Sequence, residues 1–97
     1  MDTLLVLNVN KELEDDLVDY LLELDCISGF TSMPVRGHGS RSQLSLAEQV
    51  TGRQQRLVME MLLDASAVDT VLAGLANHVG RDIVWWQQPV ARSGRIG

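Results

Sequence analysis

The order of two hydrophobic periodicities constrains the fold of this chain more than any other feature of its sequence. Two stretches repeat apolar residues every three or four positions, as amphipathic helices do, and each lies between two short stretches typical of strands. The helices are expected at residues 11–24 and from Asp64 or Ser66 to Gly80, and the strands at residues 3–9, 30–36, 56–63 and 82–88. The predicted order is therefore β-α-β-β-α-β.

This order is typical of an α+β fold, the ferredoxin-like βαββαβ sandwich, in which two helices lie on one face of a four-stranded antiparallel sheet. Ninety-seven residues suffice for one domain, which we expect to span residues 1–97. Pro34 cannot donate a ladder hydrogen bond, so the strand 30–36 is expected at an edge or with a bulge.

The open face of this sheet is expected to be apolar. Trp85 and Trp86 are neighbours in the last strand and must point to opposite faces, so one of them is left outside the monomer core. Contact with other copies of the chain would bury such a patch, and a closed ring is a common arrangement of homo-oligomers.

A long connection joins the two middle strands. Residues 37–55 are rich in glycine, serine and glutamine and show little periodicity, which predicts a long mobile loop. The segment Arg36-Gly37-His38-Gly39-Ser40-Arg41 begins it, and its glycines allow close approach of an anion to the backbone while its arginines add charged donors. The basic tail at residues 91–97 is a second candidate anion contact. A plain turn and a solvated tail remain the alternatives.

The net charge of −5 conceals a segregation of charges. Residues 12–25 hold seven acids and no base, whereas residues 36–56 hold four arginines and one acid. The acidic balance argues against a nucleic-acid-binding protein. No apolar run reaches the ~18 residues of a membrane helix, and no signal peptide is evident at the N-terminus. A cytoplasmic protein that is not inserted in a membrane is expected.

Neither a catalytic constellation nor a metal motif is evident. His38 and His78 are forty residues apart, and neither has a second ligand at a metal-like spacing, so they are weak metal candidates. Cys26 is expected to be a buried thiol, and Met59 and Met61 to pack in the core. The chain is therefore not expected to be an enzyme.

Together these features resemble the PII-like signalling proteins. Val35-Arg36-Gly37-His38-Gly39 is similar to the stretch that opens the T-loop of that family, and Arg92-Ser93-Gly94 is similar to its C-terminal Arg-Thr-Gly. More narrowly, residues 27–31, 37–41 and 46–53 resemble the DUF3240 group, a bacterial PII-like family of unknown function.

The resemblance implies a non-enzymatic regulatory homotrimer, with the sheets packed inside and a small anionic ligand held in the clefts between subunits. The ligand-binding candidates are then Arg36, Gly37, His38, Gly39, Arg41, Arg81 and Arg92. An adenine nucleotide is a candidate ligand, although the glycine- and lysine-rich loop that precedes the last strand of PII proteins is reduced here to Gly80 and Arg81.

The resemblance also implies a partner protein that contacts residues 36–56. Members of the DUF3240 group resemble products of genes that lie beside heavy-metal efflux systems, so a membrane transporter is a candidate partner. The alternative is a metal-tolerance protein similar to the CutA family, with His38, His78, Cys26 and Met33 as candidate ligands.

Overall fold

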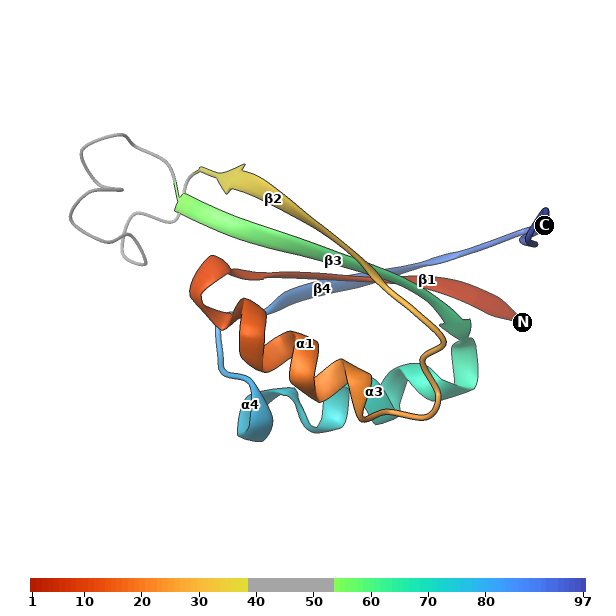
Figure 1. Ribbon diagram of the computed structural model, residues 1–97, viewed down its shortest axis with the longest axis horizontal. Helices are drawn as coiled ribbons and strands as arrows, with labels where there is room; N and C mark the ends of the chain where they lie inside the picture. The colour runs from red at the N-terminus through yellow and green to blue at the C-terminus, as the bar shows by residue number, and fades with distance from the viewer. Residues whose placement is uncertain (39–53) are drawn as a thin grey trace.

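Four antiparallel strands form one sheet, and the helices lie on one of its faces (Figure 1). The computed structural model describes residues 1–38 and 54–97. The strands are β1 (Asp2–Asn10), β2 (Thr31–Gly37), β3 (Gln54–Asp64) and β4 (Val84–Pro89), in the order β2-β3-β1-β4. The helices are α1 (Glu14–Leu22), α3 (Val68–Ala73) and α4 (Leu75–His78), with 3-10 turns at Lys11–Leu13 and Ala65–Ala67. The predicted fold class is confirmed.

The core lies between this sheet and the helices, and it follows the predicted periodicities. Every second residue of the two central strands faces the helices, and the helical stripes close over them. The buried apolar residues on this side are Leu5, Leu7, Val9, Leu17, Leu21, Leu57, Met59, Met61, Leu63, Val68, Val71, Leu75 and Val79. The prediction that Met59 and Met61 pack in the core is confirmed.

Both helical segments begin with a side-chain cap and a 3-10 turn. The side chain of Asn10 accepts a hydrogen bond from the backbone N–H of Glu12 at 2.9 Å. Asp64 accepts equivalent bonds from the backbone N–H and the hydroxyl of Ser66, at 2.9 and 2.7 Å. Asp64, rather than Ser66, is therefore the cap of the second helical segment.

The capping role of Asp64 predicts a pH dependence of stability. The hydrogen bonds from Ser66, followed by the positive N-terminus 3.4 Å away, hold the pKa of Asp64 below its ordinary value of 3.8. A carboxyl whose pKa is lower in the folded state stabilises that state above its unfolded-state pKa, and this contribution is lost as the pH falls through the folded-state pKa. Urea unfolding should therefore show a stability gap between wild type and Asp64→Ala at pH 7 that narrows below pH 3.8. A gap that is constant with pH would contradict this role.

The second helical segment is interrupted, whereas the sequence predicts one continuous helix. Gly74 separates α3 from α4 at the point where Tyr20 of α1 packs against the segment. The hydroxyl of Tyr20 donates a hydrogen bond to the carbonyl of Val71 at 2.7 Å. A Cβ atom at Gly74 would lie 2.5 Å from the Tyr20 hydroxyl oxygen, so glycine permits this close approach of α1 to the segment α3–α4.

The last strand differs most from expectation. It begins at Val84 rather than at Asp82, because Asp82 has a φ of 63° and therefore cannot continue a strand. Trp85 pairs with Leu7 and so faces the helix side, while Trp86 pairs with Val6 and faces the open side. The prediction that only one tryptophan lies outside the core is wrong: their exposed fractions are 48% and 41%. β4 is an edge strand, and the helices leave its helix-side residues uncovered.

The open face of the sheet is largely apolar, as expected. Its exposed members Met33, Leu62, Val84 and Trp86 come from all strands except β1. Val6 lies at its centre and is only 2% exposed, because side chains on both neighbouring strands flank it. In the described ranges no helix covers this face, so the isolated subunit presents it to water.

Candidate anion site at the base of the long connection

A hollow of about 650 Å³ lies at the end of the sheet where the long connection leaves β2 and returns to β3. We call it the loop-base hollow. It is lined by Lys11, Pro34, Val35, Arg36, Gln55 and Arg56. Lys11 opens the 3-10 turn that follows β1, whereas Pro34, Val35 and Arg36 belong to β2, an edge strand, as Pro34 predicts. One side of the hollow therefore opens at the free edge of the sheet.

Among the residues that the structure describes, the lining of this hollow carries positive charge and no carboxylate. Lys11 and Arg36 form no ion pair with any residue in the ranges 1–38 and 54–97. Arg36 is exposed, and its guanidinium can donate several hydrogen bonds to phosphate or carboxylate. Two unpaired cations in one concave surface produce a positive potential that attracts anions.

Arg56 has a different role, which the sequence analysis did not identify. Its Nε donates to the Asn8 side-chain oxygen at 2.7 Å, and its Nη2 donates to the carbonyls of Asn8 and Asp82 at 2.8 and 3.1 Å. Its Nη1 lies 3.0 Å from the Asp82 carboxylate. Arg56 is only 5% exposed, so it ties β1 to the segment before β4 and is largely engaged within the fold.

This network corrects the predicted extent of the partner-binding segment. Residues 36–56 do not form one exposed loop, because β2 continues through Gly37 and β3 begins at Gln54. Arg56 is the third residue of β3, and its buried guanidinium cannot contact a partner there. One sign of this structural role was available in the sequence: Arg56 is the first residue of the alternating stretch that predicts a strand, so it was expected in the sheet rather than in the loop.

The glycine-rich segment is described only in part. Gly37 ends β2 and touches the stem of Arg56: a Cβ at Gly37 would lie 3.0 Å from the Arg56 Cγ. Close packing against the Arg56 side chain is therefore a second reason for glycine at this position. His38 is exposed beside it. Gly39, Arg41 and the predicted loop at residues 39–53 lie outside the described residues.

The other two candidate arginines lie at different ends of the sheet. Arg81 is exposed in the turn before β4, next to Asp82 and thus near Arg56 at the loop end. Arg92 follows β4 and lies at the opposite end, because Val90 and Ser93 on either side of it hydrogen-bond to Asp2 near the N-terminus. Within one chain, the structure therefore places Arg36, Gly37, His38 and Arg81 at the loop end and Arg92 far from them.

The candidate metal ligands do not form a cluster. No group of three or more His, Cys, Asp or Glu side chains that could hold a metal occurs in residues 1–38 and 54–97. His78 stacks on the ring of Tyr20, with the ring centroids 5.7 Å apart. Cys26 is exposed after α1, so the prediction of a buried thiol is wrong. None of the helices in these ranges is long and apolar enough to cross a membrane.

The sequence model of a protein family of unknown function, DUF3240, matches residues 1–97. The chain belongs to the DUF3240 family. This family is the one that the glycine-rich segment and its flanking motifs resemble, so the predicted membership is confirmed. No functionally curated protein matches the sequence significantly.

Two solved structures resemble this DUF3240 protein, and one of them is described as PII-like. A DUF3240 family protein from Shewanella baltica superposes with a TM-score of 0.79 at 25% identity, over 99% of this chain and 97% of that chain. A putative PII-like signalling protein from Thermus thermophilus superposes with a TM-score of 0.61 at 22% identity, over 90% of this chain and 84% of that chain. The second likeness shows the PII-like fold alone.

Proposed function

We propose that this DUF3240 protein is a non-enzymatic regulator that binds a small anionic ligand in the loop-base hollow. The observation that carries the proposal concerns Lys11 and Arg36 in this concave surface. Among residues 1–38 and 54–97, neither cation forms an ion pair and no carboxylate lines the hollow. The PII-like fold supports a signalling role rather than catalysis. A ligand held here would touch the first residues of the long connection and could thereby change what the connection presents to a partner.

The proposed assembly is a homotrimer with the open sheet faces packed inside. Its support is the exposed apolar surface that includes Leu62, Val84 and Trp86, whose burial is favourable by about 25 cal/mol per Å² of apolar surface. Arg92 of the same chain lies at the other end of the sheet, so in the proposed trimer Arg92 of a second subunit would have to supply this contact. The ligand site would then be completed between subunits.

The proposed partner is a protein that contacts residues 36–53, with a membrane transporter of a heavy-metal efflux system as the candidate. Support comes from the DUF3240 membership and from the exposed residues Arg36 and His38, which lie where β2 ends. The regulator itself would act in the cytoplasm.

The decisive experiment is calorimetric titration of the purified protein with ATP, ADP, AMP and inorganic pyrophosphate. We expect binding of at least one of these anions, and light scattering of the same sample should give three times the chain mass of 10.7 kDa. Arg36→Ala should weaken binding about tenfold or more, because one charge-assisted hydrogen bond contributes about 1.5–3 kcal/mol.

Arg36→Lys is the matched control, since it keeps the charge and should retain part of the affinity. Lys11→Ala should weaken binding in the same direction as Arg36→Ala. The proposal is wrong if none of the four anions binds, or if wild type and Arg36→Ala bind equally well.

A further inference from the structure

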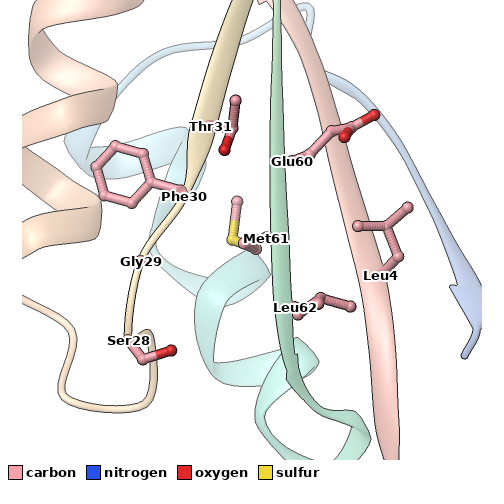
Figure 2. Close-up of a pocket in the computed structure, with 8 residues that line it drawn as sticks. All are labelled: Leu4, Ser28, Gly29, Phe30, Thr31, Glu60, Met61 and Leu62. Carbon is pink, nitrogen blue, oxygen red and sulfur yellow. The ribbon is translucent and has the colours of Figure 1, made fainter. Parts of the chain in front are cut away.

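A second hollow, of about 360 Å³, lies at the opposite end of the sheet, where β2 begins (Figure 2). We call it the strand-end hollow. The segment Ser28–Phe30 forms one wall, and Leu4, Glu60 and Leu62 from β1 and β3 form the other. The ring of Phe30 points away from it toward the helix side, where it packs on the core (Figure 2). The volume falls in the range of about 300–1,000 Å³ that is typical of ligand pockets.

Strand β3 has a free edge along this hollow. β3 pairs with β1 as far as Asp64, but its pairing with β2 ends at Thr31 opposite Glu60. No backbone hydrogen bond joins Ser28–Phe30 to Met61–Asp64 in the part of the chain that the structure describes. Alternate residues of Met61–Asp64 therefore direct their N–H and C=O groups into the hollow, as a template for another extended segment.

The chemistry of the hollow defines what such a segment should carry. Leu4 and Leu62 offer apolar surface, and Leu62 is 45% exposed. Glu60 contributes a carboxylate to the lining, and this carboxylate forms no ion pair with any described residue. An extended peptide with one aliphatic side chain and one neighbouring cation would complement both features.

The tail of this chain has that composition. Ile96 has a fully exposed side chain, and Arg95 precedes it without an ion-pair partner among the described residues. The tail does not reach the hollow of its own subunit here. The Ser93 hydroxyl donates to the Asp2 carboxylate at 2.7 Å, and beyond this contact the chain runs past the end of the sheet (Figure 1).

We infer that residues Gly94–Gly97 of a second copy of this chain occupy the strand-end hollow. The segment adds to the free edge of β3, Ile96 packs on Leu4 and Leu62, and Arg95 pairs with Glu60. This contact is independent of the loop-base hollow and uses none of its residues.

Disulfide trapping tests this contact directly. Leu62→Cys and Ile96→Cys are combined in a Cys26→Ser background, which removes the exposed native thiol. Mild oxidation should yield covalent species of two or three chains on a non-reducing gel. The matched control pairs Ile96→Cys with Leu22→Cys, an exposed position on α1, and should give no such species. Leu22, Leu62 and Ile96 are all exposed, so the replacements should preserve the fold.

Charge reversal shows whether the disulfide forms through this specific contact or through random collision of chains. Glu60→Arg alone and Arg95→Glu alone should each lower the yield of trapped chains about two- to fivefold, and the double reversal should restore it. A disulfide formed only within one chain would assign the hollow to the subunit's own tail. That result, a trapping yield equal to the Leu22→Cys control, or charge reversal without effect would overturn the inference.

Discussion

Arg56→Met should lower the free energy of unfolding by about 3 kcal/mol. The substitution removes four hydrogen bonds, to the side chain and carbonyl of Asn8 and to the carboxylate and carbonyl of Asp82. Methionine replaces the stem but leaves these partly buried oxygens without their donor. A fully buried unpaired polar group costs about 1–3 kcal/mol, and water can compensate part of this cost at Asp82, whose side chain is 40% exposed. Asp82 would also lose the contacts that hold its backbone at a φ of 63°.

Urea unfolding of both proteins measures this effect. Arg36→Met is the matched control, because Arg36 is an exposed arginine on the neighbouring strand, and its stability should stay within about 0.5 kcal/mol of wild type. Arg56→Lys should not restore stability, because a single ammonium cannot replace the fork of guanidinium donors. Equal stability of Arg56→Met and Arg36→Met would refute the structural role of Arg56.

Gly74→Ala should destabilise the fold by about 1–3 kcal/mol, although alanine normally favours a helix over glycine. The new Cβ would lie 2.5 Å from the hydroxyl oxygen and 2.8 Å from a ring carbon of Tyr20. Either the ring moves and loses its hydrogen bond to Val71, or the segment α3–α4 moves away from α1.

A double-mutant cycle assigns the cost to this contact. In a Tyr20→Ala background the clash is absent, and Gly74→Ala should become neutral or stabilising. Gly29→Ala is the control, because a Cβ there meets nothing within 4 Å. An additive cycle, with the same cost in both backgrounds, would show that Tyr20 does not set the requirement for glycine.

Periodicity predicted the elements whose burial is decided by one contiguous face. β1, β3 and α1 follow this rule, and their core residues lie where the spacing places them. Edge strand β4 does not follow it. All residues of β4 are exposed, because no helix of the described ranges reaches its helix-side residues or covers the open face. A pattern of alternation shows which residues share a face, but it cannot show which face other elements will cover.

The candidate site was only partly predictable for a similar reason. The glycine-rich segment stands out locally in the sequence, and its described residues Arg36 and Gly37 lie at the end of β2. Lys11 joins Arg36 only because β1 ends beside β3, which in turn pairs with β2. Arg56 is held within the fold by contacts with Asn8 and Asp82, which are 48 and 26 residues away. Such long-range pairings depend on strand order and register, which no local pattern specifies.

The pairing of Gly37 with Gln54 has a consequence for how this family can diverge. The connection leaves the sheet and returns to it at directly opposed residues, so the two flanking strands hold its ends together whatever its length. Doubling the length of such a loop costs only about 0.6 kcal/mol of closure entropy. Insertions, deletions or exchange of this segment can therefore occur while the scaffold remains intact, and under the proposed function they would change which partner is recognised. The same scaffold could serve different partners in different bacteria without any new core mutation.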